Sequence, residues 1–496
     1  MANISDMRQH VNLPQPNPNL SDPHLGHLQQ SFAEHVLKWF PLFDPETASQ
    51  HLRHARDTGY RQTGASLCVV FLIFTNGAIS ADNSLYLRSP HDLPGFVYYA
   101  RAVSMLERLP ITSKDLTTLQ CRLLVGLYLL FAMRSLEAWT NITQASQNCV
   151  LFLKENTCRD ASQEYREAFR RIYWYVIAPF KQIRCGLLHV TVELGSNILS
   201  RRICYVLETE LEACLDMPTS GIRTFQAVVP LPGSRYEEEG MYFLLAISSL
   251  RTVMVDVLDA VGYRSATPIV SYNPAVPLEL RRQLDEWYCH LPGPLRFRLD
   301  SNMLFDSRKA YLRCAYHALI IAATWPFVMP LSQASAHSAQ ERPKPSHWPT
   351  VGPTSNPFQE SMPQNVQQRT KSGHGTPTPT SVHLPTDAEI HDVATGRAAA
   401  QTCLDTCRSY LIDAEEILMQ RSVISHLVVH QYFAFTMILL LDFSGVDPQD
   451  GGANVKETRR LERALHNLRH WSVAPFMAES LNEIMRIARA KGLRFV

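Results

Sequence analysis

The chain has 496 residues, of which 46% are hydrophobic and 9% aromatic, with 47 lysines and arginines against 46 aspartates and glutamates. This composition excludes collagen-like and globally disordered chains, and the length allows one to three domains. A formal net charge of +1 argues against a surface wholly devoted to nucleic-acid backbones. Nucleic-acid binding would therefore have to be local or supplied by a partner.

The first residues lack a basic segment followed by an apolar core, so no secretory signal is expected. The longest apolar stretches, 123–133, 318–331 and 432–441, are shorter than the roughly 20 residues that cross a bilayer. We therefore expect buried helices and no membrane association.

Eleven cysteines are scattered along the chain, and no two of them stand at Cys-x-x-Cys spacing. The absence of this spacing excludes the usual zinc ribbons and thioredoxin-type redox motifs. Most of the cysteines have apolar neighbours, as Cys68 does, and there a thiol behaves as a small hydrophobic group. The pattern favours a reducing compartment, cytosol or nucleus.

Residues 1–27 are polar and interrupted by prolines, which predicts a disordered lead-in. Helical periodicity begins at Leu28, because Leu28, Phe32, Val36 and Phe40 recur at four-residue steps and so share one helix face. The helical part of the chain is expected to start there.

Further helices are predicted from apolar periodicity and from residues that favour helix starts. The segment 63–80 is largely apolar on all sides, which indicates a fully buried helix. A long helix is expected to begin with Thr112 and Ser113 at its N-cap. The other predicted helices cover 97–109, 139–154, 163–188, 202–214, 236–262, 277–290, 388–417, 423–443, 457–471 and 475–491. Sustained alternation of period two is missing, so the predicted fold class is all-α.

Residues 332–386 contain nine prolines, and Ser, Thr, Gln, His and Gly fill most of the remaining positions. Too few apolar side chains are present to offset the entropy of ordering this segment, so it is predicted to be a disordered insertion. It divides the helical body into a first part, 28–331, and a C-terminal part, 387–496. We expect the two parts to pack on the same body.

Two histidine pairs have the i, i+4 spacing of zinc-binding helices, His426 with His430 and His466 with His470. Neither pair contains the Glu of His-Glu-x-x-His. The first pair encloses apolar residues and is expected at the edge of the core, whereas the second has charged neighbours and is expected on a solvated face. No third or fourth ligand accompanies them, so no metal site is predicted.

For the other candidate groups of residues, a structural role is also favoured over a functional one. Cys403 and Cys407 share a helix face and are expected to pack in the core, while the acidic triplet 237–239 begins a predicted helix, where it suits the helix dipole. Residues 456–496 carry nine lysines and arginines against four acids; an amphipathic surface is favoured over contact with phosphates or an importin. Gly-x-Ser-x-Gly, Gly-x-Gly-x-x-Gly and P-loop motifs are absent. The expectation is no catalytic, cofactor-binding or metal-binding residue, and no cofactor.

Four stretches, in this order and spacing, carry a resemblance to a known family. They are LQQSFAEHVLKWFPLFDPE with VFLIFTNGAIS; LQCRLLVGLYLLFAMRSLEAWTNITQASQNCV; EYREAFRRIYWYVI; and LRRQLDEWYCHLPGPLRF with YLRCAYHALIIAATWPFV. The residues that match the family's paired-arginine and aromatic motifs are Arg170, Arg171, Tyr173, Trp174, Trp325, Pro326 and Phe327. From Leu28 to Leu493 the chain resembles the fungal-specific transcription factor regulatory domain, the middle homology region of zinc binuclear cluster regulators.

The resemblance implies a nuclear transcription regulator, not an enzyme, that controls a metabolic or biosynthetic gene set. The family's six-cysteine cluster and the Gly-Arg-Pro that usually follows Trp174 are absent here. The chain is therefore expected to reach DNA at most indirectly, through other transcriptional regulators or coactivators. A homodimer and a small-molecule effector are compatible with the resemblance. The alternative is an all-α small-molecule-binding or catalytic protein of a biosynthetic pathway, with a cavity between its helices.

Overall fold

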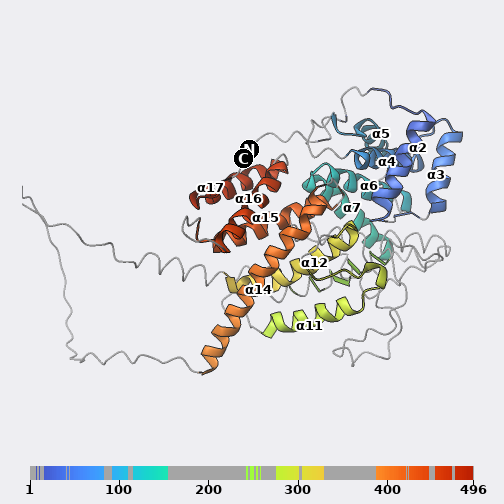
Figure 1. The fold of residues 1–496 in the computed structure, drawn as a ribbon. Helices are drawn as coiled ribbons and strands as arrows, with labels where there is room; N and C mark the ends of the chain where they lie inside the picture. Colours follow the sequence, from blue (N-terminus) through green and yellow to red (C-terminus); the bar gives the residue numbers. More distant parts are fainter. Residues whose placement is uncertain are drawn as a thin grey trace, which may run out of the picture.

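A computed structural model shows a body made of helices (Figure 1). The structure describes residues 7, 11, 16–40, 42–43, 45–82, 92–109, 115–154, 242–243, 246–247, 249–250, 253–254, 257, 275–300, 304–328, 387–419, 422, 424–445, 453–471 and 475–494. Within these ranges there are twelve α-helices and no strand, which confirms the predicted all-α class. In the same ranges, no helix combines the length and the apolar character needed to cross a membrane.

The N-terminal half of the described chain is a bundle with two buried helices, α4 (Ala65–Ala81) and α6 (Leu116–Phe131), at its centre. Its other helices are α2 (Asp22–Phe32), α3 (Pro45–Asp57), α5 (Phe96–Leu106) and α7 (Ser135–Lys154). A π-helical turn, Ala33–Leu37, continues α2, and the predicted face of Leu28, Phe32, Val36 and Phe40 is buried. α4 packs against α2, α5 and α6 (Figure 1). Because residues 67–74 of α4 are all buried, the prediction of a fully buried helix is confirmed.

Two residues in the last turns of α4 fix its distance from its neighbours. A Cβ atom on Gly77 would lie 2.0 Å from the carbonyl oxygen of Leu28, so α2 approaches α4 at a place where only glycine fits. The buried amide of Asn76 donates to the carbonyl oxygen of Leu124 on α6 at 3.0 Å. Close backbone contact on one side and a buried hydrogen bond on the other therefore hold α4 in place.

The prediction that the disordered lead-in extends to residue 27 is wrong in its last part. α2 begins at Asp22, and Leu25 in its first turn is fully buried. The Tyr98 hydroxyl on α5 donates to the carbonyl oxygen of Asn19 at 2.6 Å. Pro23 suits the first helical turn, where its missing N–H is not needed. Tertiary contact with α5 therefore orders a segment whose own composition is polar.

The predicted N-cap of the long helix is also displaced. Asp115 caps α6, because its carboxylate accepts a hydrogen bond from the backbone N–H of Thr117 at 3.2 Å. An aspartate in this position adds a negative charge at the positive end of the helix dipole, which Thr112 and Ser113 cannot provide. The helix therefore starts later than predicted.

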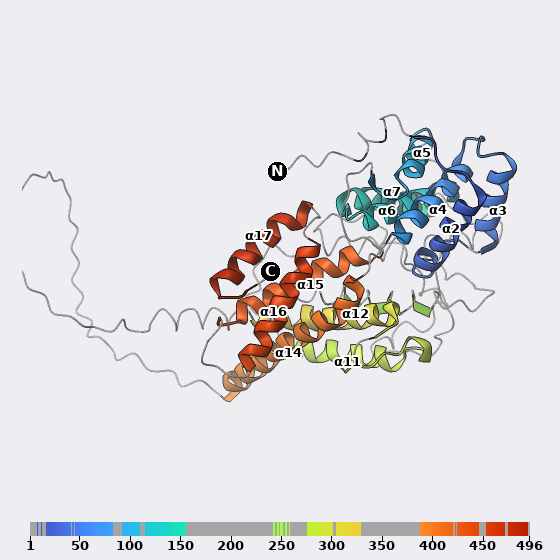
Figure 2. The same cartoon turned by 45° about the horizontal axis from the view of Figure 1, so that its top comes forward.

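The rest of the described chain forms a second group of helices, which contains α11 and α12 from before residue 332 and four helices from after it. Its elements are α11 (Ala275–Cys289), α12 (Ser307–Thr324), the 3-10 turn η5 (Trp325–Phe327), α14 (Asp387–Leu418), α15 (Ser425–Asp442), α16 (Ala453–His470) and α17 (Pro475–Ala490). α14 lies along α12, with α11 on the other side of α12 (Figure 2). α15 packs against α14, α16 and α17 and also touches α6.

Several predicted segments lie outside the described residues. They are the helices at 163–188 and 202–214, most of the helix at 236–262, the triplet 237–239 and the insertion 332–386. The predicted resumption of helix after the insertion agrees with the start of α14 at Asp387.

Candidate functional site

Buried charges meet where α12 packs on α14. The guanidinium Nη2 of Arg313 lies 2.6 Å from Oδ1 of Asp413, and the Nδ1 of His317 lies 3.0 Å from the other carboxylate oxygen, Oδ2. The Arg313 and Asp413 side chains are each 1% exposed, and His317 is 9% exposed. Asp413 on α14 therefore lies within ion-pair distance of two side chains on the facing side of α12. We call these three residues the buried charge cluster.

The spacing in the sequence explains how α12 provides two of the three groups. Arg313 and His317 are four residues apart, so they lie one turn apart on the same helix face. Nη1 of Arg313 also donates to the carbonyl oxygens of Arg298, at 3.1 Å, and Asp300, at 2.8 Å, in the segment that precedes α12. One guanidinium thus donates charge-assisted hydrogen bonds to the chain before α12 and forms an ion pair with α14.

The chemistry open to the buried charge cluster is limited. An aspartate that contacts a histidine Nδ1 is the arrangement that orients a general base, but catalysis also needs an activated nucleophile and access for a substrate. The thiol of the neighbouring Cys314 is fully buried; burial, and then the Asp413 carboxylate, raise its pKa well above its ordinary value. Cys314 therefore stays a protonated thiol, and the cluster acts as an inter-helix tie.

Aromatic side chains connect α11 to α12 beside this cluster. The ring of Trp287 stacks on that of Tyr316, with 6.3 Å between centroids, and the Tyr316 hydroxyl donates to Oδ1 of Asp285 at 2.8 Å. Burial, and then this hydrogen bond, raise the pKa of Tyr316. The Tyr288 hydroxyl donates to the carbonyl oxygen of Phe297. Residues from both segments of the fourth sequence stretch therefore form one packed unit.

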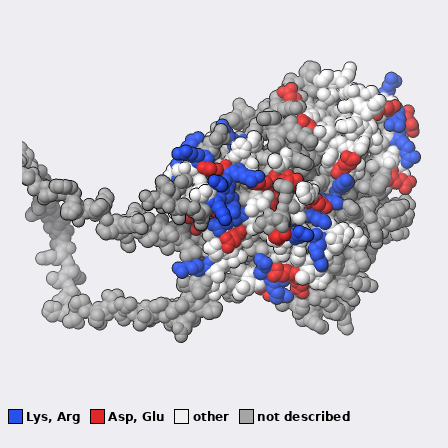
Figure 3. Space-filling view, viewed as in Figure 1, with Lys and Arg blue, Asp and Glu red and all other residues white. Residues whose placement is uncertain are grey.

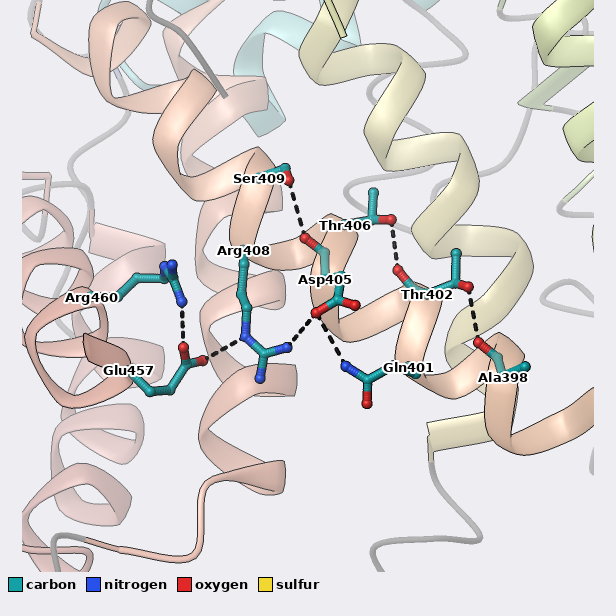
Figure 4. Close-up of polar contacts among 9 residues, drawn as sticks. All are labelled: Ala398, Gln401, Thr402, Asp405, Thr406, Arg408, Ser409, Glu457 and Arg460. Atoms are coloured by element: carbon teal, nitrogen blue, oxygen red, sulfur yellow. Dashed lines mark hydrogen bonds and ion pairs between the residues drawn. The ribbon is translucent and has the colours of Figure 1, made fainter. Parts of the chain in front are cut away.

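A polar network on the surface joins α14 to α16 (Figure 4). Arg408 contacts Asp405 on its own helix at 2.7 Å and Glu457 on α16 at 3.1 Å, and Glu457 also pairs with Arg460. Glu415 on α14 pairs with Arg463 on α16 at 2.9 Å. The carboxylate of Glu457 therefore pairs with Arg408 on the side of α16 that faces α14.

The outer side of α16 is basic. Lys456, Arg459 and Arg469 are exposed there, whereas Leu461 and Leu465 on the opposite side are buried. Figure 3 shows lysine and arginine side chains gathered over the C-terminal helices, with acidic side chains among them. The prediction of an amphipathic surface for residues 456–496 agrees with this arrangement in the part that is described.

Cys403 and Cys407 lie in the core, on the side of α14 that faces α12. Both side chains are buried. Burial raises the pKa of Cys407 well above its ordinary value, and the hydrogen bond between the two thiols adds to the shift. The same hydrogen bond lowers the pKa of Cys403, and burial opposes this shift.

The two histidine pairs differ in their surroundings. His430 on α15 is mostly buried, and burial lowers its pKa to about 4, while the side chain of His426 lies outside the described part. His466 and His470 on α16 are exposed, as predicted, and their Nε2 atoms are 3.1 Å apart. Among the described residues, no three or more His, Cys, Asp and Glu side chains form a group that could hold a metal.

The buried charge cluster was not among the candidates taken from the sequence. Arg313 and His317 stand four residues apart among the mostly apolar residues 310–323 of α12, and this pattern is the signal that could have indicated them. Their partner Asp413 lies beyond the insertion, so sequence distance hides it. Comparisons with protein-family models, with curated proteins and with solved structures found no match. The resemblance therefore rests on the residues of this chain alone.

Proposed function

We propose that the chain is a fungal transcriptional regulator: a helical regulatory domain without its own zinc cluster, which acts in the nucleus through partner proteins on a metabolic or biosynthetic gene set. The proposal rests on the four stretches that resemble the fungal-specific transcription factor regulatory domain. Other transcriptional regulators or coactivators are its expected partners. A homodimer or a small-molecule effector would be compatible with this role.

The observation that supports the proposal best is the packing of the fourth stretch. Trp287 on α11 stacks on Tyr316 of α12, and the next residue, His317, contacts Asp413 on α14. The residues that carry the resemblance therefore connect three helices of the body. A regulatory domain needs such a helical scaffold, because its surfaces must be held in place for partners.

The distribution of charge fits regulation better than catalysis. The histidine and carboxylate of the buried charge cluster are enclosed between α12 and α14, and the neighbouring thiol is protonated. The exposed side of α16 instead offers basic residues to the solvent. Such a surface suits contacts with acidic partners, and electrostatic complementarity of this kind favours partner selection and fast association.

A tethering assay tests the proposal. The full chain is fused to a heterologous DNA-binding module, and expression of a reporter under the matching site is compared with the module alone. A change in reporter expression is expected. Asp413→Asn, which is expected to destabilise the body, should abolish the change at equal protein level. No change with the wild-type chain, together with a small molecule that copurifies at one per chain, would favour the alternative of a small-molecule-binding or catalytic protein.

A second assay tests the dependence on partners for DNA binding. Purified protein is titrated against a promoter library at physiological salt. The expected binding is weak and indifferent to sequence, with a Kd of roughly 10⁻⁴ to 10⁻⁶ M, because the net charge is +1 and the zinc cluster is absent. An enriched site bound at nanomolar strength would refute partner dependence, and its loss when the exposed Lys456, Arg459 and Arg469 are changed to glutamine would assign the binding to α16.

A further inference from the structure

We propose that His466 and His470 on α16 form a solvent-open chelate for a divalent transition-metal ion of the class that prefers imidazole, with Cu²⁺ favoured over Zn²⁺. The two side chains are exposed and lie one turn apart on the helix. Their Nε2 atoms are 3.1 Å apart, and their ring centroids are 4.7 Å apart. The two nitrogens share a hydrogen bond, which places both within reach of one ion on the solvent side of the helix.

The distance between the nitrogens suits a metal ion. A metal bound to each Nε2 at about 2.0 to 2.1 Å would subtend an angle of roughly 100° across a separation of 3.1 Å. This angle lies between those of neighbouring ligands in square-planar and tetrahedral complexes. Imidazole suits Zn²⁺, Cu²⁺ and Ni²⁺, and Cu²⁺ ranks highest among these ions for nitrogen ligands.

Binding at this site requires that the hydrogen bond between the two Nε2 atoms break and that the ring donating it carry its proton on Nδ1 instead. A neutral imidazole coordinates through its unprotonated nitrogen, so each ring would carry its proton on Nδ1 when the ion is bound. No thiolate or other charged ligand has to form. Water would fill the remaining coordination positions, because the metal lies on the solvent side of α16.

The helix backbone holds the two rings in register. Leu461, Leu465 and Leu468 are buried on the other side of α16, so the backbone that carries the histidines is fixed by packing. A fixed backbone lowers the entropy lost when the chelate forms. The chelate is therefore organised before the ion arrives.

The histidine pair on α3 shows that nearness in sequence is not enough to bring two histidine rings together. His51 and His54 also lie one turn apart, on α3, but each ring contacts a different partner. Nδ1 of His51 lies 2.8 Å from Oγ of Ser66, and Nε2 of His54 lies 3.0 Å from Oε1 of Gln62. These rings do not converge, so this pair provides a matched control on another helix.

The site is expected to bind its ion reversibly. Among the described residues, no third His, Cys, Asp or Glu joins the pair to complete a structural centre. Arg463 and Arg469 on the same helix are exposed and positive, and they oppose the approach of a divalent cation. The chelate is therefore not a folding element, and the body should keep its helices without metal.

The test is a titration of the metal-free full chain with CuCl₂, and in parallel with ZnCl₂, followed by calorimetry near pH 7.5 in a weakly coordinating buffer. The chain has 19 histidines, so the comparison between variants isolates the site. We expect a saturable phase of one Cu²⁺ per chain that is lost in His466→Gln and in His470→Gln. The same phase should remain in His51→Gln and in His54→Gln.

Tryptophan fluorescence gives a second measurement of Cu²⁺ binding. Trp471 follows His470 directly, so Cu²⁺ in the chelate should quench its fluorescence, and Trp471→Phe should remove this quenching while calorimetric binding persists. Far-ultraviolet circular dichroism checks that every variant is folded. If His466→Gln and His470→Gln bind Cu²⁺ as the wild type does, or if the α3 variants lose the same phase, the proposal is wrong.

Discussion

The Arg313 guanidinium on α12 lies 2.6 Å from the Asp413 carboxylate on α14, and both side chains are almost completely enclosed. The two helices stand on either side of the segment 332–386, so this contact joins parts of the chain that are far apart in sequence. Removing one partner would leave the other as a buried charge without compensation, which costs far more than the net contribution of the intact pair.

Asp413→Asn should therefore destabilise the protein by about 3 to 5 kcal/mol, measured by urea unfolding followed by circular dichroism. Glu483→Gln, which removes an exposed partner of Arg486, serves as the control and should leave the unfolding midpoint unchanged. The double variant Arg313→Met with Asp413→Leu should recover part of the loss, because two apolar groups replace two buried charges. Equal midpoints for Asp413→Asn and Glu483→Gln would contradict this account of the buried charge cluster.

A second prediction concerns the close approach of α2 and α4. In Gly77→Ala the new Cβ would lie 2.0 Å from the carbonyl oxygen of Leu28, a backbone atom that cannot turn away. The helices must move apart, and the expected loss is about 1 to 3 kcal/mol or more.

Gly26→Ala on α2 is the matched control, because nothing lies within 4 Å of its added Cβ. It should stabilise the helix by about 0.5 to 1 kcal/mol, since alanine loses less backbone entropy than glycine. Thermal melts of the two variants should move in opposite directions. A Gly77→Ala protein as stable as Gly26→Ala would show that α2 and α4 are not in close contact.

The helices could be predicted because their patterns are local. The four-residue recurrence from Leu28 to Phe40 depends only on side chains within one helix, and so does the apolar run of α4. The start of α2 at Asp22 could not be predicted in the same way, because it depends on the contact between Asn19 and Tyr98 across the bundle. Composition indicates whether a segment would be ordered on its own, but it does not include the contacts that neighbouring helices make with it.

The buried charge cluster was missed for a related reason. Its residues come from α12 and α14. The buried carboxylate of Asp413 is stable only where both Arg313 and His317 lie beside it. Neither the sequence around Asp413 nor the sequence around Arg313 contains the other half of the arrangement. By contrast, the spacing of His466 and His470 is local, so the sequence identified the pair, although the 3.1 Å approach of the Nε2 atoms depends on rotamers that only the structure shows.

A third prediction concerns pH. Burial lowers the pKa of His430 to about 4, against 6.5 for the ordinary group, so the unfolded chain binds a proton between these values and the folded chain does not. Stability is therefore lost as the pH falls from about 6.5 to about 4, by up to about 3 kcal/mol from this group.

The measurement is the free energy of unfolding in urea across this pH range for the wild type and His430→Leu. The variant should lose less stability on acidification, and the difference between the two slopes isolates the histidine from the carboxylates. His27→Gln removes a histidine at an exposed position on α2, and its slope is the reference with which that of His430→Leu is compared. Parallel slopes for His430→Leu and the wild type would show that His430 does not stay neutral in the folded state.

A fourth prediction is that the fold needs no metal. Cys403 and Cys407 are buried, and the described residues contain no group of three or more metal ligands. Elemental analysis of folded protein after treatment with a chelator should find no retained zinc, and the helical circular dichroism signal should be unchanged. About one zinc retained per chain, with loss of helix when it is removed, would instead make the metal part of the folding free energy.

The last prediction concerns the segment between α12 and α14. Deleting residues 338–385 leaves 329–337 and 386 to connect the two helices, and about ten residues can span roughly 33 Å. A Cβ on Gly396 of α14 would lie 3.4 Å from the ring of Phe327, which places the end of η5 beside this part of α14. Asp387, where α14 begins, is nine residues away along the helix, or about 14 Å.

The shortened loop is therefore long enough to connect η5 to α14 without strain. Loop closure entropy changes by only about 0.6 kcal/mol for each doubling of loop length, so the shorter loop should be neutral or slightly stabilising. The deletion variant should unfold cooperatively, within a few degrees of the wild type in a thermal melt, and should keep the helical circular dichroism signal. A loss of cooperative unfolding would mean that residues within 338–385 contribute contacts to the folded body, against the interpretation of their composition as too poor in apolar side chains to be ordered.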